Sequence, residues 1–177
     1  MKIPRRYWDS TVFLAWLLPE AHRARACGEV LEAAERGELQ IVTSAITLTE
    51  VIKLKGKERL KEDQERQIHR FFMNDYIVVQ SLTRFIAEYA RNLIWRHSGL
   101  HPKDSIHVAT ALLARVPILD TFDEKDLVPL DGKLGSPALR IGEPALPQPG
   151  LPFPGEAQDD APSHTGEDAE GDNEGPG

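Results

Sequence analysis

Four isolated carboxylates in this chain lie where a strand is predicted to end or a helix to begin: Asp9, Glu50, Asp104 and Asp123. In an open α/β sheet, ligands bind in the crevice outside the carboxyl ends of the strands. Carboxylates gathered there repel one another unless a hard cation lies between them, and Mg²⁺ or Mn²⁺ prefers carboxylate oxygens and water. The pattern therefore indicates a metal-dependent hydrolase, and a nuclease is the main expectation.

Taken singly, each acid also has a simpler interpretation. Asp9 could be the N-cap of an apolar helix, and Asp104 could complement a helix macrodipole. Glu50 could be a solvated helical residue, although its neighbours are apolar, and Asp123 lies in an acid-rich loop where a turn is the default. The combination is more specific, because hydroxyl groups suited to orienting ligands or metal-bound water adjoin the acids. These hydroxyl residues are Ser10, Thr11, Thr47 and Thr121.

Apolar periodicity and turn residues predict the elements that must position these acids. Strands are expected at 6–8, 39–43, 76–79, 116–119 and 139–141, and helices at 12–18, 21–36, 46–55, 58–73, 83–97 and 103–115. Strands separated by crossover helices imply an α/β fold, a three-layer α/β/α sandwich with a mostly parallel central sheet. His107, three residues after Asp104, could face a phosphate or a metal-bound water, but a role in helix packing is the simpler interpretation.

The last 35 residues, 143–177, differ from the rest of the chain. They contain seven of the 13 prolines, nine Asp or Glu and no Lys or Arg. This composition cannot bury enough apolar surface to offset the entropy of ordering, so we expect a disordered acidic tail. The domain at 1–142 then has 19 acidic and 21 basic residues, and the acidic balance of the whole chain does not argue against a nucleic-acid partner.

Cysteine content and hydropathy exclude several other classes. Cys27 stands alone and offers neither a disulfide framework nor a cysteine zinc site. No N-terminal apolar run resembles a signal peptide, and no stretch approaches the roughly 20 apolar residues of a membrane span. We therefore expect a cytoplasmic protein with no membrane contact. A basic stretch at 53–70 could contact phosphates or could be a solvated, charge-laced helix.

Four short segments carry a resemblance to a known family. They are Trp8-Asp9-Ser10-Thr11, the run at 44–51, the run at 100–111 and Leu119-Asp120-Thr121-Phe122-Asp123. Together they resemble a PIN domain, in particular the VapC-type ribonuclease toxins of bacterial toxin–antitoxin systems. The resemblance spans residues 3 to about 142.

The resemblance implies a function and a set of site residues. Asp9, Glu50, Asp104 and Asp123 would hold one or two Mg²⁺ or Mn²⁺ ions, with Ser10 and Thr121 assisting. The substrate would be RNA, a cognate antitoxin protein would be a partner, and the protein would form a homodimer. Two departures stand out: Asp120 adds a charge where the family usually has an apolar or neutral residue, and the acidic tail extends beyond the usual end.

Two alternatives belong to other classes of protein. A haloacid-dehalogenase-like phosphatase also begins with a strand and an Asp, but it needs a second Asp two residues later, where this chain has Thr11. A catalytically silent PIN fold that binds RNA or protein would keep the architecture without cleavage. The presence of all four acids argues against the silent module, and metal-dependent cleavage that EDTA abolishes would distinguish the two.

Overall fold

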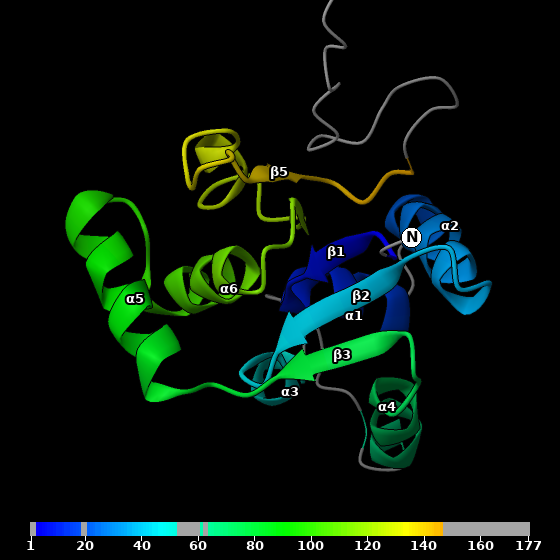
Figure 1. Cartoon of the computed structure of the whole chain (residues 1–177). Coiled ribbons are helices and arrows are strands. Elements are labelled where there is room, and N and C mark those ends of the chain that lie inside the picture. The colour runs from blue at the N-terminus through cyan, green and yellow to red at the C-terminus, as the bar shows by residue number, and fades with distance from the viewer. Residues whose placement is uncertain (1–2, 19–20, 53–60, 62–63, 147–177) are drawn as a thin grey trace, which may run out of the picture.

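A computed structural model describes residues 3–18, 21–52, 61 and 64–146 of this chain. Its centre is one five-stranded sheet, in the order β3-β2-β1-β4-β5, with every neighbouring pair parallel (Figure 1). The strands are β1 (Arg5–Trp8), β2 (Gln40–Ser44), β3 (Ile77–Gln80), β4 (Ile118–Asp120) and β5 (Arg140–Gly142). The predicted α/β class with a parallel sheet is confirmed.

Helices cover both faces of the sheet. They are α1 (Ser10–Leu17), α2 (Ala21–Glu35), α3 (Thr47–Glu50), α4 (Glu65–Phe72), α5 (Arg84–Arg96) and α6 (Pro102–Leu113), with a 3₁₀ turn, η2, at Val128–Leu130. One buried cluster joins α1, α2 and α4 to the sheet, and a second joins α5 and α6 to its other face. This arrangement is the three-layer sandwich that the sequence predicted.

Local sequence signals account for several helix ends. Thr83 caps α5, since its hydroxyl accepts the Ile86 N–H at 3.3 Å. Pro102 occupies the first turn of α6, where its missing N–H costs no helical hydrogen bond. Gly37 follows the end of α2 with a φ of +75°, a conformation that favours glycine after a helix.

The strand order places the ends of β1 and β4 side by side. The chain runs from β1 to β2 and β3 on one side and then returns to β4 on the other, so β1 and β4 flank a topological switch point. Trp8 is in register with Asp120, and the Asp9 N–H donates to the Asp120 carbonyl at 3.3 Å. The residues after these two strands, Asp9 and Thr121, therefore meet at the carboxyl edge of the sheet.

Some predicted boundaries differ from those observed. The helix expected at 46–55 is the single turn α3, and residues 53–55 lie outside the described part. In the helix expected at 58–73, Lys61 is not helical and α4 begins at Glu65, while residues 58–60 and 62–63 lie outside the description. Helix α6 follows α5 directly, as the predicted helices at 83–97 and 103–115 implied, and Asp104 lies in its first turn.

The end of the described chain packs on the domain. Pro144 is buried and Leu146 packs against the first core cluster, so residues up to 146 contact the fold. The acidic tail was predicted to begin at residue 143, so its first four residues are described and two of them, Pro144 and Leu146, pack on the domain, whereas residues 147–177 lie outside the description. Among the helices that are described, none is long and apolar enough to cross a membrane.

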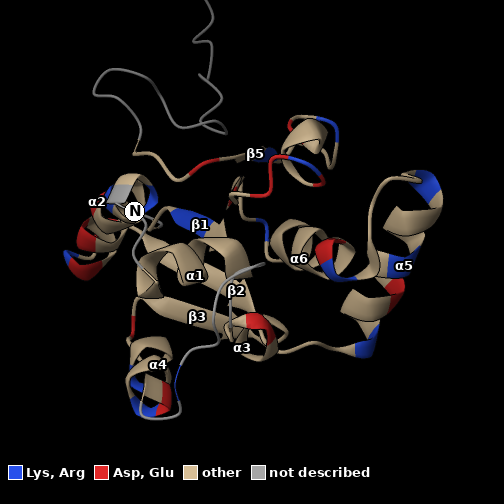
Figure 2. Cartoon of the chain, turned by 180° about the vertical axis from the view of Figure 1, so that it is seen from behind, with Lys and Arg blue, Asp and Glu red and all other residues tan. Residues whose placement is uncertain are grey.

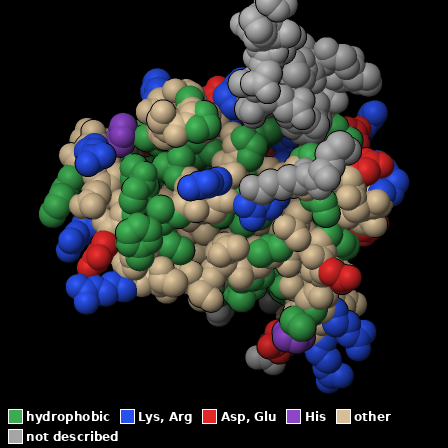
Figure 3. Space-filling view, viewed as in Figure 1, with side chains coloured by type: hydrophobic (Ala, Val, Ile, Leu, Met, Phe, Trp, Pro, Cys, Tyr) green, Lys and Arg blue, Asp and Glu red, His purple; other side chains and the backbone are tan. Residues whose placement is uncertain are grey.

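Exposed hydrophobic side chains lie over α5 (Figure 3). Phe85 and Trp95 are 65% and 74% exposed. Lys, Arg, Asp and Glu positions lie mostly on helices and loops, and those on the strands are Arg5 and Arg6 of β1, Asp120 of β4 and Arg140 of β5 (Figure 2). Arginines on the central strand of a buried sheet require a specific partner, and that partner lies beneath the candidate site.

Candidate metal and catalytic site

Asp9 is a buried carboxylate between the end of β1 and the start of α1. It caps α1, because its Oδ1 accepts hydrogen bonds from Thr11 N at 2.9 Å, Val12 N at 3.2 Å and Thr11 Oγ1 at 2.6 Å. The simpler interpretation of Asp9 as an N-cap is therefore confirmed. Only 2% of the residue is exposed, and burial raises the pKa of its carboxyl group against the opposing influence of His107 and these hydrogen bonds.

The hydroxyl of Thr121 links Asp9 to Asp123. It donates to Asp9 Oδ2 at 2.6 Å, and it accepts the Asp123 N–H at 2.9 Å. Thr11 Oγ1 lies 3.4 Å from Thr121 Oγ1 and accepts the Phe122 N–H at 2.9 Å, which fixes the loop after β4 to the start of α1. The hydroxyls that contact Asp9 thus come from Thr11 and Thr121. Ser10 is the half-buried first residue of α1, and its predicted assistance stays a prediction.

Asp104, Asp123 and Asp126 form a cluster of three carboxylates at this edge. One oxygen from each lies within 4.8 Å of the others, and all three residues are half-buried. Asp104 comes from the first turn of α6, and the other two come from the loop after β4. Burial, together with the negative charges of Asp123, Asp126 and Asp9, raises the pKa of Asp104 to about 6, against the influence of His107.

This cluster fits a divalent cation. Its donors are all carboxylate oxygens, which is the ligand set that Mg²⁺ and Mn²⁺ prefer. The raised pKa of Asp104 reflects burial first and then repulsion from neighbouring carboxylates, and a cation between the groups would relieve that repulsion. The main candidates for ligands are therefore Asp104, Asp123 and Asp126, with Asp9 adjoining them through Thr121.

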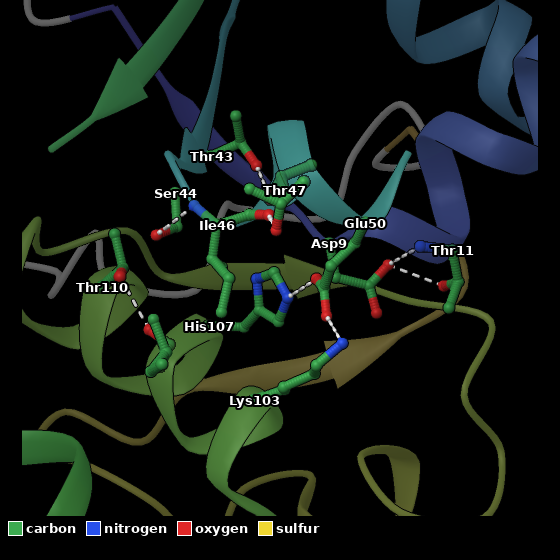
Figure 4. Close-up of polar contacts among 12 residues, drawn as sticks. Asp9, Thr11, Thr43, Ser44, Ile46, Thr47, Glu50, Lys103, His107 and Thr110 are labelled. Atoms are coloured by element: carbon green, nitrogen blue, oxygen red, sulfur yellow. Dashed lines mark hydrogen bonds and ion pairs between the residues drawn. The ribbon is translucent and has the colours of Figure 1, made fainter. Parts of the chain in front are cut away.

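Glu50 lies between His107 and Lys103 (Figure 4). Its Oε2 lies 2.8 Å from His107 Nε2, and its Oε1 lies 3.3 Å from Lys103 Nζ. Burial raises the pKa of Glu50, but the hydrogen bonds and charges of His107 and Lys103 outweigh burial and hold it below its usual value. Glu50 is therefore ionised at neutral pH and already has two partners on the protein.

His107 connects Glu50 to the core. Only 2% of it is exposed, and its Nδ1 lies 2.8 Å from the hydroxyl of Tyr7, whose pKa is raised by burial. An ionised carboxylate only accepts hydrogen bonds, so His107 Nε2 is the donor to Glu50. Of the two interpretations of His107, helix packing agrees with its burial, and its contact with Glu50 adds an orienting role that neither interpretation contained.

Asp120 is not an extra charge in the site but half of a buried ion pair. Its carboxylate accepts from Arg6 Nε at 2.7 Å, from Arg6 Nη2 at 2.5 Å and from Trp8 Nε1 at 2.9 Å. Asp120 is fully buried and Arg6 is 4% exposed. The charge of Asp120, which departs from the family pattern, is therefore balanced by Arg6 on the neighbouring strand β1. Asp120 immediately precedes Thr121 in the chain, so the pair lies next to the site.

The structure thus sorts the predicted residues into connected groups. It places Asp104 and Asp123 together, joins Asp9 to Asp123 through Thr121, and holds Glu50 on His107 and Lys103. The sequence reasoning missed Asp126. Its position three residues after Asp123 was the available signal, because the Asp126 N–H donates to Asp123 Oδ1 at 2.9 Å and the turn brings both side chains to the same edge.

Comparisons with known proteins agree with this geometry. The sequence model of the PIN domain matches residues 6–129. A solved structure described as a toxin–antitoxin complex from Klebsiella pneumoniae is 26% identical, with a TM-score of 0.52, and the match covers 68% of this chain and 88% of that one. A search of curated proteins gave no match. With the parallel sheet, the switch point and the carboxylates at its edge, the family match leads to one conclusion: this chain belongs to the PIN domain family.

Proposed function

We propose that this PIN domain is a metal-dependent endoribonuclease that hydrolyses RNA phosphodiester bonds. The observation that carries the proposal is the cluster of Asp104, Asp123 and Asp126 beside buried Asp9, at the switch point of a parallel sheet. A surplus of carboxylates in one place is unfavourable for binding a polyanion unless cations compensate it. A divalent ion, when bound, supplies water of lowered pKa and neutralises charge on the reacting phosphate.

The protein residues have distinct tasks in this proposal. Asp104, Asp123 and Asp126 hold Mg²⁺ or Mn²⁺ with their carboxylate oxygens. Thr121 fixes the orientation of Asp9 by donating to its Oδ2, so that Asp9 can act as a further ligand. Glu50 keeps a low pKa and is therefore a weak base, so it orients water by accepting a hydrogen bond or completes a second ion's coordination.

We further propose that the protein is the toxin of a toxin–antitoxin pair. The support is the 26% identity to a chain of a toxin–antitoxin complex. A cognate antitoxin would then be a partner, and a second copy of the chain would be another. The exposed aromatic residues Phe85 and Trp95 on α5 supply apolar surface of the kind that protein partners cover.

The test of the nuclease proposal compares metals, substrates and variants. A fluorescent single-stranded RNA is incubated with the full chain and Mg²⁺, Mn²⁺ or EDTA, and a DNA of the same sequence serves as the substrate control. Cleavage of RNA is expected with the metals and not with EDTA. The Asp123→Asn variant should lose activity, whereas Asp75→Asn, an exposed acid before β3 at the opposite edge of the sheet, should retain it. Binding of RNA without cleavage under every metal condition would instead support the catalytically silent module.

A further inference from the structure

Lys103 is exposed to solvent and forms an ion pair with Glu50. It lies in the first turn of α6, next to Asp104, and its Nζ is 3.3 Å from Glu50 Oε1. The lysine side chain is 69% exposed, whereas that of Glu50 is 12% exposed. Figure 4 shows the lysine reaching Glu50 from the same helix that carries His107.

The charges around Lys103 are almost all negative. Within the described part of the chain, the site contains the carboxylates of Asp9, Glu50, Asp104, Asp123 and Asp126, gathered at the carboxyl edge of the sheet. Among the described residues, Glu50 is the member of this group that forms ion pairs, one with buried His107 and one with exposed Lys103. Lys103 is therefore the solvent-exposed cation paired with a carboxylate of the site.

Two properties of this pair make it exchangeable. An exposed lysine–carboxylate pair is weak, because solvent screens the charges and a long side chain must be immobilised. Glu50 also keeps its His107 hydrogen bond when Lys103 leaves, so the carboxylate would not be left without a partner. A dication bound among the neighbouring carboxylates would repel the ammonium and weaken its attraction to Glu50.

We propose that Lys103 exchanges between two anions. It neutralises Glu50 in the metal-free protein, and it contacts a phosphate of the RNA once a divalent cation occupies the carboxylates. The contact of Lys103 with RNA rests on the proposed ribonuclease function, whereas the competition between Lys103 and a divalent cation requires no RNA cleavage. Lys103 would thus be a substrate-positioning residue whose availability depends on the metal.

The first experiment needs no RNA. Mn²⁺ binding to the full chain is measured by calorimetry at low salt for the wild type, Lys103→Met and Lys133→Met, the last being another exposed lysine outside these contacts. Removal of the competing ammonium should tighten Mn²⁺ binding by roughly 1.5- to 5-fold in Lys103→Met, the range expected for an exposed pair. The Lys133→Met variant should bind like the wild type. Unchanged or weaker Mn²⁺ binding by Lys103→Met would overturn the exchange.

The second experiment measures RNA affinity with and without a divalent ion. A labelled single-stranded RNA is titrated in Ca²⁺, under conditions where intact RNA is recovered, and in EDTA. In Ca²⁺, Lys103→Met should bind several-fold more weakly, with a salt slope reduced by about 0.7 for one lost phosphate contact, and Lys103→Arg should retain most of the affinity. In EDTA, Lys103→Met and wild type should differ little, because Lys103 is engaged by Glu50.

The two experiments separate the exchange from the nuclease proposal. Equal weakening by Lys103→Met in Ca²⁺ and in EDTA would identify a fixed phosphate contact and refute the exchange. If the wild type fails to cleave RNA but Lys103→Met tightens Mn²⁺ binding, the metal competition stands and the ribonuclease proposal fails. If RNA is cleaved and Mn²⁺ binding is unaffected by Lys103→Met, the exchange fails alone.

Discussion

The buried pair of Arg6 and Asp120 allows a quantitative test of what holds the site in place. Arg6→Met would leave a fully buried carboxylate with only the Trp8 N–H as a donor, and Asp120→Asn would leave a guanidinium that is 4% exposed without its counter-charge. Removing one partner of a buried pair costs about 3–5 kcal/mol in the free energy of unfolding. Two such losses added together, about 6–10 kcal/mol, would consume most of the stability of a typical domain.

The double variant Arg6→Met, Asp120→Asn should be far more stable than that sum. It has no charged side chain at position 6 or 120, and the introduced amide oxygen of Asp120→Asn can still accept the Trp8 Nε1–H. We expect it to lose about 1–2 kcal/mol, roughly the loss of one or two ordinary hydrogen bonds, so the coupling energy of the cycle is about 4–9 kcal/mol. Urea unfolding of the four proteins, followed by circular dichroism, measures it.

An internal control comes from a pair of the same chemical type on the surface. Arg84 Nε lies 2.8 Å from Glu88 Oε1, but the two side chains are 91% and 44% exposed. The corresponding cycle there should give a coupling of about 0.3–0.5 kcal/mol. If the double variant at Arg6 and Asp120 is as unstable as the sum of the single variants, the pair does not act as a unit, and the argument for it as a scaffold beneath the site is refuted.

Three further predictions concern the site and the chain end. In EDTA, Asp104→Asn should raise the free energy of unfolding by about 1–2 kcal/mol at pH 7.5, because the folded-state pKa of about 6 against 3.8 corresponds to about 3 kcal/mol, reduced here for partial exposure. A carboxyl group with a raised pKa destabilises the fold wherever the unfolded chain is ionised, so the gain should shrink as the pH falls from about 6 towards 3.8 and vanish below it. Urea unfolding across this pH range tests it, and a gain as large below pH 3.8 as at pH 7.5 would contradict the reasoning. Thr121→Val should lower the free energy of unfolding by about 1–3 kcal/mol and weaken Mn²⁺ binding, and Thr121→Ser should restore both. Urea unfolding and calorimetry measure these effects. A Mn²⁺ affinity of Thr121→Val equal to that of the wild type would mean that Thr121 does not orient Asp9. Truncation after Leu146 should leave the melting temperature unchanged. If the removed acidic residues compete with RNA for the basic residues of the domain, the truncated protein should bind RNA more tightly than the full chain at low salt. Equal RNA affinities of the two proteins at both low and high salt would refute the competition.

The fold could be predicted from the sequence because its signals are local. The apolar run at 116–119 precedes and enters β4, which spans Ile118–Asp120, and the periodicity of residues 83–97 matches α5 with its two caps. The turn α3 ends at Glu50 because Val51 leaves the helical conformation, with a ψ of 65°, and the Ile52 N–H then donates to the Glu50 carbonyl at 2.7 Å instead of continuing the helical pattern. Local propensity does not determine where such a short helix ends.

The partners within the site could not be predicted in the same way, because they are distant in sequence. His107 lies 57 residues from Glu50, and Asp120 lies 114 residues from Arg6. Nothing in a single sequence states that a helical histidine will meet a particular glutamate. The parallel pairing of β1 with β4, in the register Trp8 to Asp120, is what creates the second contact. Asp126 was missed for another reason, since acids in a loop usually do no more than form turns.

The placement of β1 at the middle of the sheet has a consequence for the protein during its synthesis. Asp9 is synthesised 112 residues before Thr121, which orients it. At roughly 5–20 residues per second the interval is roughly 6–22 s, and pairing over such a sequence distance adds a slow folding step. Throughout this time the nascent chain contains β1 without β4, and any product that stops before Asp126 lacks the complete carboxylate cluster. Under the proposed function, a chain that stops before Asp126 therefore lacks residues that cleavage requires.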